Sequence, residues 1–326
     1  MAHPVEQMQS HLAEKMDAVN TLIRTRMASE HAPRIPEVTA HLVEAGGKRI
    51  RPLLTLAAAD ICGYQGDHDV RLAATVEFIH TATLLHDDVV DESDQRRGRP
   101  TANLLWDNQS SVLVGDYLFA RSFQLMVETG SLRVLDILAN AAAVIAEGEV
   151  LQLSVARNLG VTEETYIKVV RGKTAALFAA ATQVGGVIAE ATEDEIEALW
   201  AYGDALGISF QMVDDLIDYG DAADTGKNTG DDLREGKMTM PVILAIARAE
   251  GDDMAFWERV IGKGKVEEGD VARATEILHR TGALDTTRDR ALEWSAAAKE
   301  ALDLLPQGPL TDTLSDLADY VVARIS

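Results

Sequence analysis

Apolar residues recur every three or four positions along most of this chain, which is the spacing of one face of an α-helix. In the first predicted helix, over about 5–28, the apolar positions are Val5, Met8, Leu12, Met16, Val19 and Ile23. Further helices are predicted at about 50–61, 68–92, 105–128, 131–158, 163–185, 193–220, 240–249, 266–280, 285–304 and 310–325. No segment shows the strict alternation of a half-buried strand. The pattern predicts an all-α protein.

The breaks between these segments fall at Gly and Pro clusters, and no Gly/Ser-rich or Pro-rich linker marks a domain boundary. We therefore predict one domain over residues 1–326, with the N-terminal helix at its periphery. The segments 68–92, 131–158 and 193–220 are apolar on most of their faces. Such helices are expected at the centre of a helical bundle.

The amino-acid composition is consistent with a helical protein and narrows the range of functions to be considered. The chain has 326 residues, 47% of them apolar, and its single cysteine, Cys62, cannot form an internal disulfide. We expect a cytoplasmic protein, because the start lacks the pattern of a secretory signal and no apolar run approaches the ~20 residues of a membrane span. Any membrane contact is expected to be peripheral and transient, for product release. The net charge of −23 argues against a nucleic-acid partner.

Two Asp-Asp-x-x-Asp segments, at 87–91 and 214–218, carry the strongest chemical signal. Residues four apart share a helix face, so Asp87 and Asp91 should point together, as should Asp214 and Asp218. Acidic residues usually line a solvated face, but both segments interrupt strongly apolar helices, where an unpaired carboxylate is costly. Mg²⁺ takes one or two carboxylates while phosphate oxygens and water complete its octahedron. The two helices are thus predicted to hold Mg²⁺ ions and a diphosphate between them.

Basic residues follow each acidic segment. Arg96 and Arg97 come after the first, Lys227 and Lys237 come after the second, and Lys173-Thr174 lies between them. Taken singly, each cation is more often a solubilising surface residue. Their places beside glycine breaks, next to carboxylate clusters, favour a role in gripping phosphate oxygens.

A third basic group, Gly46-Gly47-Lys48-Arg49-Ile50-Arg51-Pro52, stands at a predicted helix start. Glycines allow close backbone approach, and a helix N-terminus favours an anion. This predicts a second phosphate site without metal ligands of its own. His80 lies seven residues before Asp87, on the same helix face, and is a candidate donor.

These motifs together resemble the trans-isoprenyl (polyprenyl) diphosphate synthase family, and within it the long-chain synthases that make quinone side chains. The resemblance covers the middle three-quarters of the chain and is carried by GGKRIRP at 46–52, HTATLLHDDVVDESDQRRGRPTAN at 80–103, GEVLQL at 148–153, KT at 173–174, and FQMVDDLIDYGDAADTGKNTGDDLREGKMTMP at 210–241. It implies an isoprenoid synthase fold, an all-α bundle around a central apolar cavity.

The resemblance also implies roles for individual residues. Asp87, Asp91 and Asp214 match the metal ligands of three Mg²⁺ ions, with Mn²⁺ as a substitute. The catalytic set also includes Asp88, Asp215, Asp218 and Lys173. The positions that hold the allylic diphosphate are Arg96, Lys173, Thr174, Gln211, Lys227 and Lys237. The positions that hold isopentenyl diphosphate are Lys48, Arg51, His80 and Arg97. Gln152 departs from the aspartate of short-chain relatives, so Glu149 and Gln152 are left out of the ligand set.

The implied reaction is head-to-tail condensation of isopentenyl diphosphate onto a farnesyl or geranyl diphosphate primer. Product length should follow from an apolar tunnel below the first motif. In the family, bulky aromatic residues one turn before that motif close the tunnel early, whereas this chain has Ala82 and Thr83. A C40–C50 product is therefore expected, although small residues could equally serve close helix packing. Phe119, Phe123 and Met126 are candidate floor residues.

Three alternatives remain open on the sequence. A class I terpene cyclase needs no second diphosphate site, and Lys48, Arg51 and His80 argue against it. A short-chain synthase is disfavoured by Ala82 and Thr83. A non-catalytic subunit of a heteromeric synthase typically lacks aspartates of one or both motifs. Family resemblance further suggests a homodimer, with apolar helix faces near 105–158 as its interface.

Overall fold

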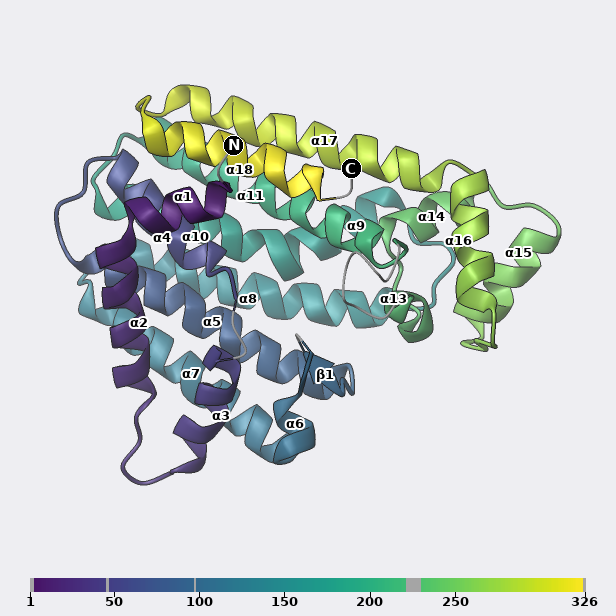
Figure 1. Ribbon diagram of the computed structural model, residues 1–326, viewed down its shortest axis with the longest axis horizontal. Helices are drawn as coiled ribbons and strands as arrows, with labels where there is room; N and C mark the ends of the chain where they lie inside the picture. Colours follow the sequence, from purple (N-terminus) through teal and green to yellow (C-terminus); the bar gives the residue numbers. More distant parts are fainter. Residues whose placement is uncertain (1–2, 45–46, 97, 221–229, 325–326) are drawn as a thin grey trace. The chain divides into compact units, whose positions relative to one another are not determined.

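The computed structural model describes residues 3–44, 47–96, 98–220 and 230–324, and these residues are almost entirely helical (Figure 1). They fall into two compact units. The first unit comprises Met1–Ala142, Leu177–Trp200 and Leu304–Thr313, and the second comprises Ala143–Ala176, Ala201–Asp303 and Leu314–Ser326. Helices α8 (Leu132–Val155) and α11 (Glu193–Ile217) contribute residues to both units. The predicted all-α class is confirmed.

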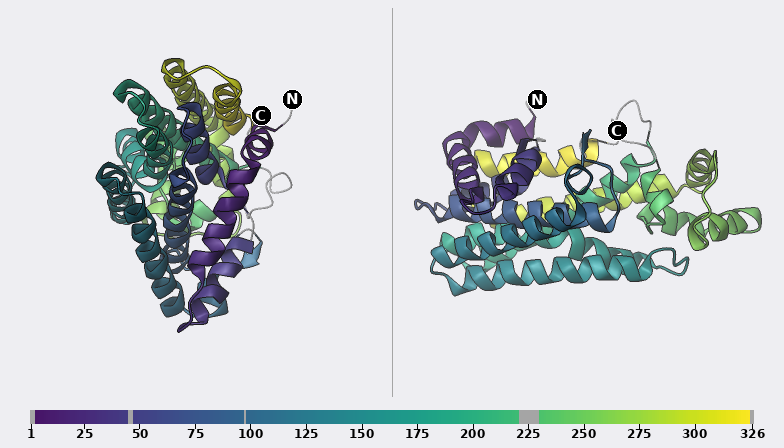
Figure 2. Two further views of the ribbon diagram at one scale, coloured as in Figure 1. Left: turned by 90° about the vertical axis from the view of Figure 1, so that its left-hand side faces the viewer. Right: turned by 90° about the horizontal axis from the view of Figure 1, so that it is seen from below.

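The first unit is built around one long, buried helix. Its elements are α1 (Pro4–His11), α2 (Ala13–Met27), α3 (Arg34–Glu44), α4 (Ile50–Ile61), α5 (His68–Val90), α6 (Ala102–Leu105), α7 (Asn108–Glu128) and most of α10 (Ala176–Ile188). Helix α5 packs against α2, α4 and α7 (Figures 1 and 2). Every residue from Leu72 to Ile79 is buried, as predicted for a helix that is apolar on most faces.

The N-terminal helix has the predicted apolar face but bends at one residue. All six apolar positions from Val5 to Ile23 are buried. The helix is divided at Leu12, where φ is −103° and ψ is 19°, so α1 and α2 are separate elements. The two helices pack against α4 and α5.

Two elements of the first unit depart from the sequence pattern. Helix α3 was not predicted from the sequence. Pro36 lies in the first turn of α3, where the missing amide proton is not needed by the helix. A short antiparallel hairpin, β1 (Gln95–Arg96) and β2 (Arg99–Pro100), follows the first acidic motif, although no strand was predicted. Two-residue strands are too short to show alternation.

The second unit combines the C-terminal parts of α8 and α11 with the helices that follow them. Its other elements are α9 (Glu163–Val170), a π-helical turn (Arg171–Ala175), α13 (Asp231–Glu235), α14 (Met240–Ala247), α15 (Asp252–Trp257), a second π-helical turn (Glu258–Gly262), α16 (Asp270–Arg280), α17 (Ala283–Ala301) and a 3₁₀ turn (Leu302–Leu304) leading to α18 (Pro309–Ala323). Helix α14 packs against α9, α16 and α17. Figure 2 shows α15 and α16 at one end of this unit.

A close backbone contact explains why the predicted helix 163–185 is interrupted. A Cβ atom added to Gly172 would lie 2.9 Å from the Cα of Gly148, and one added to Gly148 would lie 2.7 Å from the backbone nitrogen of Lys173. Helix α8 and the π-helical turn therefore meet backbone to backbone, which only glycine permits at these two positions. π-Helical turns of this kind often occur at functional sites, and this one carries Lys173 and Thr174.

Within the described ranges, every helix falls short of the length or the apolar character that a membrane crossing requires.

Candidate active site

The middle aspartate of the first acidic motif is neutralised by the hairpin that follows it. Asp88 lies in the last turn of α5 and is 0% exposed. Arg96 in β1 donates to its Oδ1 atom from both Nε, at 2.8 Å, and Nη2, at 2.7 Å. The buried Oδ2 atom of Asp88 accepts no hydrogen bond from any described residue. Arg96 was assigned from the sequence to diphosphate binding. In the structure, its guanidinium pairs instead with a carboxylate of the first acidic motif.

Asp87 and Asp91 are each half-buried at the end of the same helix. The backbone nitrogen of Asp91 donates to the carbonyl of Asp87 at 2.8 Å, so helical geometry continues through the motif. Residues four apart in that geometry share a face, as the sequence predicted. These two carboxylates are therefore side by side on α5.

Two of the predicted isopentenyl diphosphate residues are in contact. Arg51 in the first turn of α4 approaches His80 on α5, with 3.3 Å between Nη1 and Nε2. The guanidinium of Arg51 also lies 4.3 Å from the ring centroid of Phe178, a cation–π contact. Lys48 is exposed just before α4, and Arg97 lies outside the described residues.

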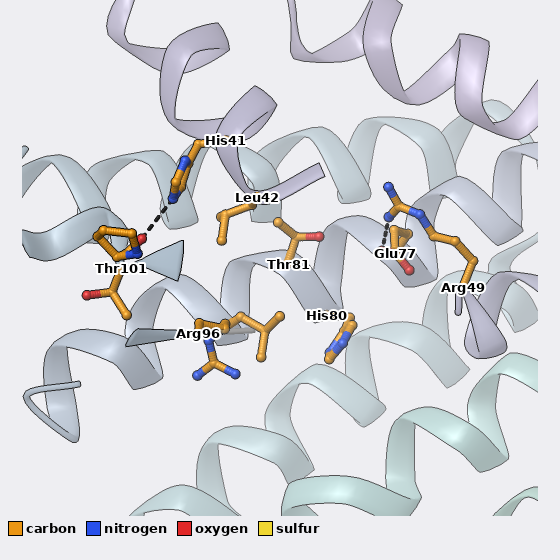
Figure 3. Close-up of a pocket in the computed structure, with 10 residues that line it drawn as sticks. His41, Leu42, Arg49, Glu77, His80, Thr81, Arg96 and Thr101 are labelled. Atoms are coloured by element: carbon orange, nitrogen blue, oxygen red, sulfur yellow. Dashed lines mark hydrogen bonds and ion pairs between the residues drawn. The ribbon is translucent and has the colours of Figure 1, made fainter. Parts of the chain in front are cut away.

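A pocket adjoins this pair within the first unit (Figure 3). It is lined by polar and cationic groups from α3, α4, α5 and the hairpin: His41, Arg49, Glu77, His80, Thr81, Arg96 and Thr101. Arg49 forms an ion pair with Glu77, and His41 Nε2 lies 2.8 Å from the carbonyl oxygen of Pro100. The contact between His41 and Pro100 joins α3 to the hairpin that carries Arg96.

In the second unit, Asp215 is the most deeply buried aspartate of the second acidic motif. It is 2% exposed and accepts hydrogen bonds from the Tyr166 hydroxyl at 2.7 Å, the Gln211 side chain at 3.0 Å and the Met240 amide at 3.2 Å. Burial, with the charge of Asp232 nearby, raises the pKa of Asp215 to about 7. Helix α9, which carries Tyr166, and the start of α14 thus serve to hold this carboxylate.

Asp218 and Asp214 have different surroundings. Helix α11 ends at Ile217, and the Asp218 carboxylate accepts from the backbone amides of Asp231, at 3.2 Å, and Asp232, at 3.3 Å, at the N-terminus of α13. Burial and the charge of Asp232 raise the pKa of Asp218 to about 7. Asp214 is half-buried, and its Oδ1 atom lies 3.5 Å from Nη2 of Arg324 near the end of the chain.

Arg96, one of the six residues predicted to hold the allylic diphosphate, lines the pocket of the first unit. Four of the others line one pocket of the second unit. These are Lys173, Thr174, Gln211 and Lys237, and Asp215, Asp232 and Tyr166 line the same pocket. Lys173 pairs with Glu149 at 2.9 Å, and Lys237 pairs with Glu235 and lies 4.0 Å from Asp232. The hydroxyl of Thr174 donates to the Gln211 side-chain oxygen at 2.8 Å. Lys227 lies outside the described residues.

The residues assigned to product length lie on α5 and α7. Ala82 and Met126 are fully buried, and Thr83 donates to the carbonyl of His80. Phe119 stacks on His86 with ring centroids 6.0 Å apart. Phe123 is 42% exposed in this chain. Their role in a tunnel stays a prediction.

The donor set fits a divalent cation with hard oxygen ligands. Among the residues that can be described, no three His, Cys, Asp or Glu side chains form a preassembled metal centre. Burial, and secondarily the negative charge of Asp232, raises the pKa values of Asp215 and Asp218 on either side of Asp214 in the chain. A bound cation would relieve the repulsion from Asp232. The site therefore fits a divalent cation electrostatically, because the cation would offset the negative charge of these carboxylates.

Comparison with known proteins shows the family and the fold to which the chain is similar. The sequence model of the polyprenyl synthetase family matches residues 32–278. The octaprenyl diphosphate synthase of Escherichia coli K12 is 43% identical over 321 residues, covering 98% of this chain and 99% of the relative. The crystal structure of a decaprenyl diphosphate synthase from Rhodobacter capsulatus superposes with a TM-score of 0.96 at 65% identity, covering 99% of both chains. A polyprenyl synthase from Caulobacter crescentus CB15, complexed with calcium and isoprenyl diphosphate, gives 0.94 at 50% identity, covering 99% of this chain and 98% of that one.

This chain belongs to the polyprenyl synthetase family. The predicted class of enzyme, a prenyltransferase, and the predicted isoprenoid synthase fold are confirmed. The predicted function at the level of a long-chain trans-polyprenyl diphosphate synthase is confirmed by relatives that match over nearly the whole chain.

Several residues of the two pockets escaped the sequence analysis. Tyr166, Arg49, Glu77 and Asp232 were not singled out, although each contacts or lines a predicted site. Tyr166 and Asp215 are 49 residues apart in the chain, and Arg49 and Glu77 are 28 apart. Contacts between residues so far apart in the chain leave no signal in the local periodicity of the sequence. Asp232 had a weak signal, since it lies inside the second long motif.

The two raised pKa values predict how stability depends on pH in the absence of metal. The pKa values of Asp215 and Asp218, about 7 when folded, exceed the ordinary value of 3.8, so the folded state binds these protons more tightly. The free energy of unfolding should therefore fall as pH rises from about 5 to about 8. Urea unfolding in EDTA measures this slope, and Asp215→Asn should flatten it. Stability that rises over the same interval would contradict the assignment.

Proposed function

We propose that this chain is a Mg²⁺-dependent synthase that condenses isopentenyl diphosphate onto a farnesyl or geranyl diphosphate primer and releases a C40–C50 all-trans product. The observation that carries the proposal is a pair of cation-lined pockets, one in each unit, each beside an aspartate-rich segment. A head-to-tail condensation needs two diphosphate sites, whereas ionisation followed by cyclisation needs only one. The Caulobacter crescentus structure with calcium and isoprenyl diphosphate supports both the metal and the ligand class.

The two substrates are assigned to different sets of side chains. Isopentenyl diphosphate is held by Lys48, Arg51, His80 and Arg97. The allylic diphosphate is held by Arg96, Lys173, Thr174, Gln211, Lys227 and Lys237. Arg96 pairs with Asp88, which is 0% exposed, whereas Lys173 and Lys237 pair with carboxylates and the side chains on both sides of these pairs are 23–35% exposed. Partly exposed pairs of this kind are weak, so a diphosphate can compete for the cations.

Asp87, Asp91 and Asp214 would hold three Mg²⁺ ions, with Asp88, Asp215 and Asp218 supporting them. When bound, the metal supplies positive charge against the negative charge that builds on the leaving diphosphate. Lys173 and the other cations assigned to the allylic diphosphate stabilise the same negative charge, because they are already in position when the bond to the leaving diphosphate breaks. The apolar walls exclude water, which would otherwise trap the allylic cation as an alcohol. The released diphosphate then accepts the proton.

We place this activity in the cytoplasm and assign the product to quinone side chains. The single cysteine, Cys62, is a free thiol, which suits a reducing compartment. Burial raises its pKa to about 11, so the thiol is protonated and unreactive at neutral pH.

Removing one metal carboxylate from either motif should abolish most of the activity. Asp87→Asn and Asp214→Asn are each expected to lower kcat by about 100-fold or more, because a metal-binding charge is lost where the leaving group departs. Asp194→Asn, on an exposed turn of α11, is the control and should retain full activity. Release of diphosphate with Mg²⁺, farnesyl diphosphate and isopentenyl diphosphate measures the effect. Full activity in either variant, or in wild type with all divalent metal chelated, would contradict the proposal.

A bulky residue at Ala82 should shorten the product. Ala82 is fully buried on α5, one turn before Asp87, so Ala82→Phe should block the tunnel. We expect the main product to fall to about farnesyl or geranylgeranyl length, read by chromatography of the dephosphorylated prenols. An unchanged product distribution from a folded variant would show that the tunnel lies elsewhere.

We also propose that the chain acts as a homodimer through α7 and the neighbouring part of α8. Large apolar side chains are exposed there: Val112, Leu113, Phe123, Val127 and Leu132. An exposed apolar patch of this kind marks an interface. We expect Leu113→Glu to shift the protein from dimer to monomer in light scattering. Leu304→Glu is the matched control, because Leu304 and Leu113 are both 65% exposed, and it should leave the dimer intact. A monomeric wild type would contradict this proposal.

A further inference from the structure

The residue just before α4 has an unfavourable backbone conformation for its type. Arg49 has φ 50° and ψ 38°, in the left-handed region that side chains with a Cβ rarely adopt. It stands between Lys48 and Arg51, the two cations assigned to isopentenyl diphosphate. A change of backbone at Arg49 would redirect the chain at the start of α4. Something must therefore hold Arg49 in place.

The ion pair of Arg49 with Glu77 provides that restraint. The Arg49 and Glu77 side chains are only 15% and 11% exposed, so their attraction is weakly screened by solvent. Glu77 lies on α5 three residues before His80, and both line the pocket of the first unit (Figure 3). The ion pair therefore holds the segment before α4 against helix α5, close to the contact between His80 and Arg51.

The same pair leaves Arg49 poorly suited to bind a phosphate itself. Its guanidinium already faces a carboxylate that is largely buried, whereas Lys48 is exposed. A diphosphate at Arg49 would have to compete with this largely buried carboxylate, which is costly. The two neighbouring arginines thus have different partners: Arg51 contacts His80, and Arg49 pairs with Glu77.

We propose that Arg49 and Glu77 are positioning residues for the isopentenyl diphosphate subsite. Their ion pair holds the residue before α4 in the left-handed conformation that sets the course of the chain from Lys48 to Arg51, which contacts His80. The inference rests on the proposed function, since it concerns the second substrate of that reaction. It assigns the pair no contact with the substrate.

The test compares single variants by steady-state kinetics in both substrates. Glu77→Gln keeps the shape of the side chain but removes its charge. We expect its KM for isopentenyl diphosphate to rise about tenfold, with KM for farnesyl diphosphate and kcat changed less than about twofold. Asp69→Asn is the matched control, because Asp69 is also on α5, is 0% exposed, and pairs with Lys15 at 2.6 Å away from the pocket. It should lower the melting temperature without changing either KM.

A second variant separates positioning from a general loss of packing. Glycine adopts the left-handed conformation freely, so Arg49→Gly added to Glu77→Gln should restore part of the lost affinity for isopentenyl diphosphate. Equal increases in both KM values for Glu77→Gln, or no rescue by glycine, would overturn the inference. So would tighter binding of isopentenyl diphosphate by Glu77→Gln, since that result would make Arg49 a phosphate ligand restrained by Glu77. Failure of the proposed function is recognised separately, by a wild type that forms no prenyl product.

Discussion

The cost of burying carboxylates in an apolar helical protein shapes both halves of the candidate site. Asp88, Asp215 and Asp218 are each at most 9% exposed, and each is compensated differently. Asp88 has the guanidinium of Arg96, whereas Asp215 has the hydroxyl of Tyr166 together with amide donors. Asp218 has the amide groups that begin α13. The hairpin, α9 and α13 are thus local structures that make it possible to keep an acidic motif inside the protein.

The same constraint explains how a chain of net charge −23 can accept anionic substrates. Lys173 and Lys237 do not give the site an excess of positive charge, because each pairs with a nearby carboxylate. Burial, together with the negative charge of Asp232, raises the pKa values of Asp215 and Asp218 to about 7. In our account divalent ions reverse this local field, and the paired cations are then free to grip diphosphate oxygens. On this proposal, metal and substrate would bind together.

Periodicity and motifs in the sequence were enough to predict the long helices, the acidic motifs and the family, because each depends on residues close together in the chain. The predicted boundaries of α5, α7 and α8 differ from the observed ones by a few residues, since capping decides them. The hairpin and the short helices α6, α13 and α15 were not predicted, because segments of two to six residues are too short to show a period. Helix α3 was also missed, although Ile35, Val38 and Leu42 have helical spacing. The π-helical turn was missed because the contact between Gly148 and Gly172 joins residues distant in the chain. Tyr166 and Glu77 were missed for the same reason, as their roles come from partners distant in sequence.

The central claim is that the two aspartate motifs bind divalent metal together with a diphosphate. Its most direct test is a crystal structure of the protein grown with Mn²⁺ and inorganic diphosphate, with anomalous scattering used to locate the metal. We predict metal peaks within coordination distance of Asp87, Asp91 and Asp214, bridged by diphosphate oxygens. Metal bound only at other carboxylates, or a diphosphate bound with no metal at these three residues, would contradict the account.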